Sequence, residues 1–386
     1  MSVTEVDRIV AAGLHCGIKP SGAPDLAIVA VTGDRPAIAA GVFTTNRFAA
    51  APVLVSRDHL LRSEGRGRAV LINSGNANAG TGEQGVRDAR RTCEAVADAL
   101  GCDPVEVLVC STGIIGRPLE VDRIVAAVPE LVRRADSQGA EAAARAIMTT
   151  DTKPKTSTRR SGGTTVAGIA KGAAMLSPSM ATMLAVITTD AAVDAQTLTA
   201  ELHRAVEQSF HRITVDGCRS TNDTVLVLAT GDRGCAVDDL RHALCSVCSD
   251  LAEQMVRDAE GATKFVTVAV HGAASDAEAL TAARRIAESL LVKCSLYGED
   301  PYWGRVASEV GAAGVAMNPD TLRISYGGTV VADGGISVPH DAEAVARHMA
   351  GREVELVVDL GLGDGSATVL TSDLTHGYVD ENKGTS

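Results

Sequence analysis

The pattern of apolar and polar positions predicts short strands separated by amphipathic helices. Short apolar runs that end in turn-forming residues predict strands at 68–73, 105–110, 165–170, 182–189, 224–230, 265–271, 353–359 and 367–372. Apolar residues at helical spacing predict helices at 85–100, 194–210, 238–259, 275–290 and 342–349. A hairpin is expected around Gly327-Gly328, and the most loop-like stretch is 152–164. This mixed order favours a mixed α/β fold with partly antiparallel sheets over a doubly wound one.

Length and composition predict a large buried core. The chain has 386 residues, of which 45% are hydrophobic, but only 2% are aromatic. A core of this kind is built mainly from Ala, Val, Leu and Ile, which suits closely packed layers. Two intimately packed domains are expected at this length, since we find no internal repeat and no linker that divides the chain into independent halves.

Charge and cysteine usage exclude several classes of protein. The net charge is −12, and the densest basic cluster is only Arg159-Arg160, so a nucleic-acid partner is not expected. The nine cysteines are scattered through apolar segments, unlike a disulfide framework, and Cys245 and Cys248 fall on the apolar pattern of a predicted helix. Neither a signal-peptide pattern nor an apolar stretch of membrane-spanning length is found, so we expect a cytoplasmic protein without membrane association.

Motifs for nucleotide or metal binding receive little support. The stretch Gly80–Gly85 matches G-x-G-x-x-G, but six residues separate Asn73 from Gly80, which places the glycines too far from the predicted strand for the tight first turn of a dinucleotide site. No phosphate loop closed by Lys-Ser or Lys-Thr and no H-E-x-x-H motif is present, and the nine histidines are dispersed. We therefore expect neither a cofactor nor a metal.

The stretch from Lys171 to Leu184 contains a candidate nucleophile. The small residue Ala181 precedes Thr182 where a loop meets a predicted strand. Cleavage of the Ala181–Thr182 bond would free an α-amine beside the threonine hydroxyl, and such an amine can act as its base near neutral pH. From these residues alone, an ordinary Ala-Thr pair before a strand remains the more common explanation.

A second candidate is the segment Ser111–Gly116, which follows the strand predicted at 105–110. A glycine-containing turn at the end of a strand can direct backbone N–H groups at one point, as a tetrahedral oxyanion requires. From these residues alone, an ordinary turn is the more common explanation. Neither candidate identifies an activity without further information.

Many ordered stretches together resemble the ornithine acetyltransferase family, also known as the glutamate N-acetyltransferases of arginine biosynthesis. The resemblance extends from near residue 17 to the end of the chain. The matching stretches are 17–22 (GIKPSG), 41–46 (GVFTTN), 111–116 (STGIIG), 148–152 (MTTDT), 171–184, 216–217 (DG), 220–224 (STNDT), 260–264 (EGATK), 291–293 (LVK), 300–305 (DPYWGR), 372–375 (SDLT), 378–379 (YV) and Asn382.

The resemblance implies a fold and a maturation step. The expected fold is an αββα sandwich of the N-terminal-nucleophile type with a second, smaller α/β domain within about 235–386. Self-cleavage is expected to give an α chain, 1–181, and a β chain, 182–386, which both contribute to the αββα core. The two chains are expected to remain together as an α2β2 heterotetramer.

The resemblance also implies roles for individual residues. Thr182 is the expected nucleophile in both self-cleavage and acetyl transfer, while Thr112 and Gly113 match the oxyanion-hole pair. The expected substrate contacts are Thr149, Lys171, Glu260, Asn382 and Ser386. From the residues alone, Lys171 could pair with a carboxylate and Glu260 with an ammonium, although ordinary ion pairs are the usual role of such side chains.

The implied reaction transfers an acetyl group from N2-acetylornithine to glutamate through an acetyl-threonine intermediate. Some family members also accept acetyl-CoA as the donor. Departures from the family pattern include Tyr302 in place of Asn, with Ala174, Ser179 and Cys294 in place of Gly, Asn and Thr. The terminus after Asn382 is short and lacks an aromatic residue, so that Thr385 or Ser386 would replace the usual final contact.

These departures leave other functions open. One alternative is a paralogous N-acyltransferase that acts on another amine in specialised metabolism. An amidase or aminopeptidase with the same nucleophile would use water as the acceptor, and a degenerate binding protein would remain uncleaved. Product analysis and the state of the Ala181–Thr182 bond distinguish these possibilities.

Overall fold

Small and β-branched residues form two sheets that pack against each other in the larger of two units, Met1–His211 with Arg219–Met255. The computed structural model describes residues 2–177 and 183–384. In the first sheet the strand order is β1 (Ile9–Leu14), β2 (Leu26–Val31), β5 (Ala69–Asn76) and β6 (Val107–Ile114). In the second sheet the order is β4 (Arg66–Gly67), β3 (Ala37–Phe43), β10 (Thr224–Arg233), β9 (Leu184–Ala191), β8 (Thr164–Lys171) and β7 (Lys155–Ser161).

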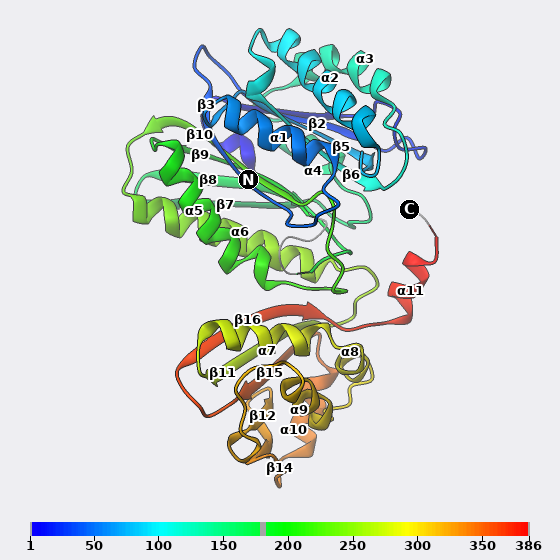
Figure 1. Ribbon diagram of the computed structural model, residues 1–386, viewed down its shortest axis with the longest axis vertical. Coiled ribbons are helices and arrows are strands. Elements are labelled where there is room, and N and C mark those ends of the chain that lie inside the picture. Colours follow the sequence, from blue (N-terminus) through cyan, green and yellow to red (C-terminus); the bar gives the residue numbers. More distant parts are fainter. Residues whose placement is uncertain (1, 178–182, 385–386) are drawn as a thin grey trace. The chain divides into compact units, whose positions relative to one another are not determined.

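Helices cover the outer faces of both sheets (Figure 1). The first sheet packs on α2 (Gly82–Leu100) and α3 (Val121–Arg134) through one apolar cluster. The other face of that sheet shares a second cluster with β3, β8, β9 and β10. The second sheet is covered by α5 (Ala195–Gln208) and α6 (Val237–Arg257), while α1 (Ala51–Arg62) packs on β6 and α4 (Ala140–Ala146) on β1. The unit is thus an αββα sandwich, and the predicted mixed α/β class is confirmed.

Strand register aligns several strand ends in the second sheet. Lys171, the last residue of β8, pairs with Leu184, the first residue of β9. Leu184 in turn pairs with Thr224, the first residue of β10, and Thr224 pairs with Phe43 at the end of β3. Residues that immediately precede or follow these four positions therefore lie side by side at the same end of the four strands.

The smaller unit, Arg212–Cys218 with Val256–Gly384, has a sheet and a core of its own. Its strand order is β14 (Ile336–Ser337), β13 (Thr329–Asp333), β12 (Arg323–Tyr326), β15 (Glu353–Asp359), β11 (Phe265–Ala273) and β16 (Gly365–Ser372). Its helices are α7 (Asp276–Glu288), α8 (Leu290–Tyr297), α9 (Trp303–Gly311), α10 (Ala342–Ala350) and α11 (His376–Asn382). The segment 212–218 joins this unit because Ile213 forms a bridge with Leu370 of β16.

The expected loop at 152–164 is wrong, because most of it forms strand β7 (Lys155–Ser161), paired with β8. This strand lies at the edge of its sheet, where polar residues are well tolerated on the exposed face. Gly162 and Gly163, with φ of +54° and +85°, form the hairpin turn that follows. The loop prediction was wrong because it rested on the polar composition of this segment, which an exposed edge strand shares.

Other expectations from the sequence agree with the structure. The predicted hairpin is present between β12 and β13, where Gly327 and Gly328 both have positive φ. Cys245 and Cys248 lie on α6 as free thiols, and Cys248 is buried in the core. None of the helices in the described part of the chain has the length and apolar character needed to cross a membrane.

Candidate functional site

Two predicted site residues meet where strand ends of both sheets of the larger unit come together. The ammonium of Lys171, at the end of β8, donates a hydrogen bond of 3.0 Å to the Thr112 hydroxyl near the end of β6. Both residues are buried, with exposed fractions of 2% and 1%. Because Oγ1 of Thr112 accepts this bond, its own proton is free to point towards another acceptor.

Gly113 occupies a position that requires glycine. Its φ is +129°, and a Cβ atom there would lie 2.3 Å from the carbonyl carbon of Gly75 on the neighbouring strand. The pairing of β5 with β6 is irregular at this point, where both Thr112 and Ile114 pair with Asn76. A turn was expected for Ser111–Gly116, but β6 continues to Ile114, and the bulge redirects the backbone at Gly113.

The Asp151 carboxylate connects the loop carrying Thr149 with the segment that follows Lys171. Its Oδ2 accepts the Thr149 N–H at 3.0 Å, and its Oδ1 accepts the Gly172 N–H at 2.7 Å. The Lys155 ammonium is 2.5 Å from Oδ1, and both side chains of this ion pair are fully buried. Burial alone would raise the pKa of Asp151, but Lys171, Lys155 and the Gly172 N–H hold it below its usual value.

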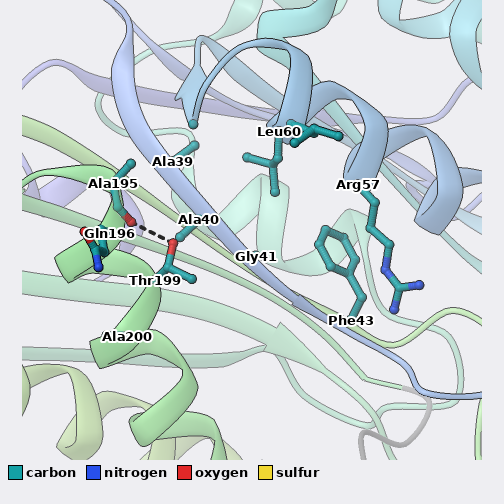
Figure 2. Close-up of a pocket in the computed structure, with 12 residues that line it drawn as sticks. Ala39, Ala40, Gly41, Phe43, Arg57, Leu60, Ala195, Gln196, Thr199 and Ala200 are labelled. Atoms are coloured by element: carbon teal, nitrogen blue, oxygen red, sulfur yellow. Dashed lines mark hydrogen bonds between the residues drawn. The ribbon is translucent and has the colours of Figure 1, made fainter.

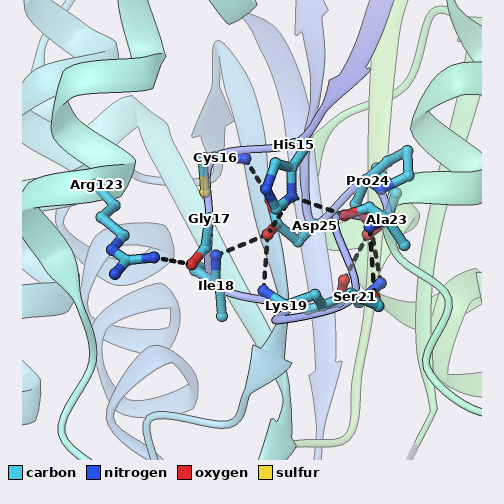
Figure 3. A network of polar contacts seen from close by, with 12 residues as sticks. His15, Cys16, Gly17, Ile18, Lys19, Ser21, Ala23, Pro24, Asp25 and Arg123 are labelled. Carbon is cyan, nitrogen blue, oxygen red and sulfur yellow. Dashed lines mark hydrogen bonds and ion pairs between the residues drawn. The ribbon is translucent and has the colours of Figure 1, made fainter.

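A second buried carboxylate, Asp25, fixes the loop just before β2 (Figure 3). It accepts N–H groups from Cys16, Ile18 and Lys19 at 2.6, 2.7 and 2.9 Å. These bonds outweigh burial and lower the pKa of Asp25. The loop is thereby held in one conformation beside the ends of β1 and β5.

Lys19, in the loop held by Asp25, also contacts the segment just before Thr149, although the sequence analysis did not assign it a role. Its ammonium donates to the backbone carbonyls of Met148 and Pro24 at 2.7 and 2.8 Å. Burial and the charge of Lys171 lower its pKa, against the opposing effect of carboxylates. The only indication in the sequence was its place in the matching stretch GIKPSG.

Asn222 and Asp223, the two residues before β10, form hydrogen bonds with the residues that precede Thr112 and β9. The side-chain amide of Asn222 donates to the carbonyls of Ala77 and Ser111 at 2.6 and 2.8 Å. Oδ1 of Asp223 accepts the N–H of Met183 at 2.9 Å. Complete burial raises the pKa of Asp223 well above its usual value. These contacts fix the chain immediately after Thr182.

Three predicted site residues, Ala181, Thr182 and Ser386, lie outside the described residues. Glu260 and Asn382 lie in the smaller unit, where the Asn382 amide donates to the Glu260 carboxylate at 2.6 Å. The backbones around them approach closely, because a Cβ on Gly261 would lie 2.3 Å from the Tyr378 nitrogen. The structure thus brings Glu260 and Asn382 together within the smaller unit, and Thr112, Gly113, Thr149 and Lys171 within the larger one.

An apolar groove of about 650 Å³ lies elsewhere on the larger unit, between α1 and α5 over strand β3 (Figure 2). Its lining includes Gly41, Phe43 and Leu60, and the Arg57 guanidinium stacks 5.2 Å from the centre of the Phe43 ring. Of the predicted site residues that the structure describes, none lines this groove. Within residues 2–177 and 183–384, no cluster of three or more His, Cys, Asp or Glu side chains is arranged to hold a metal ion.

Comparisons with known proteins converge on one family. The model of the ArgJ family matches residues 10–384. The arginine biosynthesis bifunctional protein ArgJ of Streptomyces coelicolor is 48% identical over 99% of both chains. The ArgJ protein of Mycobacterium leprae is also 48% identical, over 98% of this chain and 94% of its own.

Solved structures from the same group are also similar to this chain. The crystal structure of ArgJ from Bacillus halodurans has a TM-score of 0.49 at 36% identity, covering 51% of this chain and 96% of its own. Ornithine acetyltransferase from Mycobacterium tuberculosis, crystallised with ornithine, has a TM-score of 0.42 at 43% identity, covering 46% and 95%.

Proposed function

This chain belongs to the ArgJ family, and we propose that it transfers an acetyl group from N2-acetylornithine to glutamate. The products are ornithine and N-acetylglutamate, and the acetyl group passes through an ester on Thr182. The structural observation that carries the proposal is the buried hydrogen bond from Lys171, the last residue of β8, to Thr112. Strand β9, which begins two residues after Thr182, starts beside Lys171. Full-length similarity to bifunctional ArgJ proteins supports the same reaction.

Activation begins with self-cleavage between Ala181 and Thr182. Fragments 1–181 and 182–386 then share one αββα core, since β9 and β10 follow the cut and the other strands of that unit precede it. The smaller α/β domain, expected within about 235–386, belongs wholly to the second fragment. We propose that the mature enzyme is an α2β2 assembly of the two fragments in the cytoplasm.

The first half-reaction transfers the acetyl group to the enzyme. Oγ1 of Thr182 attacks the acetyl carbonyl carbon while its proton moves to the α-amine of the same residue, which has an intrinsic pKa of roughly 7.7–8.0. The Thr112 hydroxyl and the Gly113 N–H stabilise the resulting oxyanion. The C–N bond then breaks, the departing ornithine nitrogen takes the proton, and an acetyl-threonine ester remains.

The second half-reaction returns the acetyl group to an amine. The neutral α-amine of glutamate attacks the ester carbonyl and gives one N–H proton to the Thr182 α-amine. This amine passes the proton to Oγ1 as the C–O bond breaks, so that Thr182 leaves as its hydroxyl. Lys171 binds the substrate carboxylate and Glu260 its ammonium, with Thr149, Asn382 and Ser386 as further contacts. The residues themselves supply the nucleophile, base and oxyanion donors, so neither a metal nor a nucleotide cofactor takes part. Acetyl-CoA as a second donor belongs to the same proposal.

Product analysis tests the proposal. The purified protein is incubated with acetylornithine and glutamate, and N-acetylglutamate is measured by mass spectrometry, beside Thr182→Ala and a control, Thr281→Ala, on the exposed face of α7. The wild type and the control should form N-acetylglutamate, and Thr182→Ala should form none. Free acetate at a rate independent of glutamate would overturn the proposal in favour of an amidase, and an inactive, uncleaved wild type would favour a binding protein.

A further inference from the structure

Lys19 lies close to Gly113, one of the two expected oxyanion-hole residues. It belongs to the loop that Asp25 holds between β1 and β2 (Figure 3). A Cβ added at Gly75 would lie 3.0 Å from Cγ of Lys19, and Gly75 pairs with Gly113 on the neighbouring strand β6. The methylene stem of Lys19 thus packs against the strand residue that lies next to Gly113.

The half-buried ammonium of Lys19 binds the segment that leads to Thr149. It donates to the backbone carbonyls of Met148 and Pro24 at 2.7 and 2.8 Å. An ammonium has three N–H donors, so one of them remains available for a further acceptor. In the described part of the chain, Lys19 forms no ion pair with a carboxylate. A half-buried cation of this kind is suited to bind an anion that comes from outside the chain.

The two carboxylates near Lys19 are engaged by other groups. Asp25 accepts three N–H groups of its own loop, and its Oδ2 lies 3.1 Å from Nδ1 of His15. Asp151 forms its ion pair with Lys155, at 2.5 Å. Both carboxylates therefore act on the Lys19 ammonium only through the longer-range Coulomb interaction.

A second cation acts on Lys19 from the end of β8. Burial and the charge of Lys171 lower the pKa of Lys19, although Asp25 and Asp151 oppose this shift. The ammonium of Lys171 in turn lies 3.0 Å from the Thr112 hydroxyl. Two like charges held near each other repel, and an anion placed between them would replace this repulsion by attraction.

The covalent structure of an N2-acetylated amino acid supplies such an anion. Only the acetyl carbon, N2 and Cα separate the acetyl oxygen from the carbon of the α-carboxylate, so the two are less than roughly 5 Å apart. Lys171 is bonded to Thr112, and Lys19 packs on the strand residue beside Gly113. An acetyl oxygen bound by Thr112 and Gly113 therefore brings the α-carboxylate towards both ammonium groups.

We propose that Lys19 is a second cation of the carboxylate-binding site, and that its ammonium donates to the substrate α-carboxylate together with Lys171. The inference rests on the proposed function, which supplies an N-acetylated amino acid as the substrate. The α-carboxylate is common to ornithine and glutamate, so Lys19 serves both half-reactions. The bonds to Met148 and Pro24 hold the ammonium in place before the substrate binds, which lowers the entropic cost of binding.

Putrescine, which is ornithine without its α-carboxylate, separates this role from a structural one. The dissociation constants of ornithine and putrescine are measured by titration calorimetry for the purified wild type, Lys19→Met and a control, Lys153→Met. Methionine keeps an unbranched apolar stem but has neither the charge nor the N–H donors. Lys153 lies in the same unit with an exposed side chain, so the control removes the same charge at the surface.

The wild type should bind ornithine more tightly than putrescine. Lys19→Met should weaken the binding of ornithine about tenfold or more, as the loss of a hydrogen bond to a charged group does, and should change the binding of putrescine much less. Lys153→Met should change the ratio of the two constants by less than about twofold. An equal loss for both ligands in Lys19→Met would overturn the proposal and leave Lys19 a structural residue. A wild type without preference for ornithine, or a control that shifts the ratio as far, would also overturn it.

A measurement on the wild type keeps the test decisive if Lys19→Met does not fold. Reductive methylation of lysine side chains is read by peptide mass spectrometry in the presence of N-acetylglutamate or of N-acetyl-γ-aminobutyrate, which lacks the α-carboxylate. Neither ligand has a primary amine that would consume the reagent. N-acetylglutamate should protect Lys19, whereas N-acetyl-γ-aminobutyrate should not, and Lys153 should react equally with both. Equal reaction of Lys19 in the two samples would refute the pairing.

The two levels of the argument fail in different ways. A wild type that prefers ornithine to putrescine but forms no N-acetylglutamate refutes the proposed function, and the role of Lys19 in binding the carboxylate is still decided by the two dissociation constants. An active enzyme in which Lys19→Met keeps the wild-type preference refutes only the role of Lys19.

Discussion

The buried ion pair of Asp151 and Lys155 offers a sharp test of how the site is supported. Replacing Asp151 by Asn preserves the shape of the side chain and an acceptor for the Gly172 N–H. It removes the counter-charge of Lys155, whose ammonium lies 2.5 Å from Oδ1 with both side chains fully buried. It also places an amide nitrogen opposite the Thr149 N–H, which now donates to Oδ2 at 3.0 Å. The variant should therefore lose both stability and activity.

The expected size of the stability loss follows from the distance and the burial. At 2.5 Å and an effective dielectric constant near 20, the Coulomb attraction of the pair is about 7 kcal/mol. The cost of removing both charges from water offsets much of this attraction, and breaking a buried pair from one side costs about 3–5 kcal/mol. Asp151→Asn should thus lower the free energy of unfolding by about 3 kcal/mol. The double variant with Lys155→Met should lose less, because the Lys155 ammonium is then no longer buried without its carboxylate.

The measurement is urea unfolding followed by circular dichroism, in a Thr182→Ala background that keeps the chain in one piece. The control is Glu130→Gln on the surface of α3, where the carboxylate pairs with the exposed arginines Arg133 and Arg134. The control should unfold as its parent does. Equal unfolding midpoints for Asp151→Asn and the control, or a double variant less stable than Asp151→Asn, would refute the reasoning.

Two further predictions concern the backbone and the pH response of the site. Gly113→Ala should abolish acetyl transfer and lower the yield of folded protein, because its Cβ would lie 2.3 Å from Gly75 and its φ is +129°. Activity and melting temperature are compared with those of Gly311→Ala, where a Cβ meets open space. Wild-type activity in Gly113→Ala would contradict this prediction. Because the pKa of Asp25 is lowered on folding, its stabilising effect is present above the unfolded pKa of about 3.9 and is lost as pH falls through the folded pKa. Asp25→Asn should accordingly melt lower at pH 7 and show a smaller fall in melting temperature on acidification, and parallel pH curves for variant and wild type would count against this.

The periodicity of the chain predicted the mixed α/β class, whereas the αββα sandwich was an expectation from the family resemblance. Strands β1, β2 and β3 were not predicted, although they too are largely apolar. Strands β8 and β9 are buried along their whole length and stand out in the sequence for that reason. The edge strand β7 was missed, since its exposed positions carry Thr, Arg and Ser and resemble a loop. The glycines of Ser111–Gly116 also led us to expect a turn there, whereas β6 continues to Ile114 through a bulge where Gly113 approaches Gly75.

The site was predictable only in part. Thr112, Gly113, Thr149 and Lys171 came from the family resemblance, and the structure shows the contacts that bring them together in the larger unit. The buried carboxylates that support them were not predicted, because an aspartate in a sequence is usually exposed. A usable signal existed nevertheless: Asp25 and Asp223 each stand immediately before a long apolar strand.

The central claim is that this chain activates itself by cutting before Thr182, and intact mass under denaturing conditions tests it most directly. Purified wild-type protein and the Thr182→Ala variant are compared. We predict two fragments from the wild type, 1–181 and 182–386, and a single chain of 386 residues from the variant. A wild type that remains one chain of full length would contradict the claim, because the α-amine that the mechanism requires would never form.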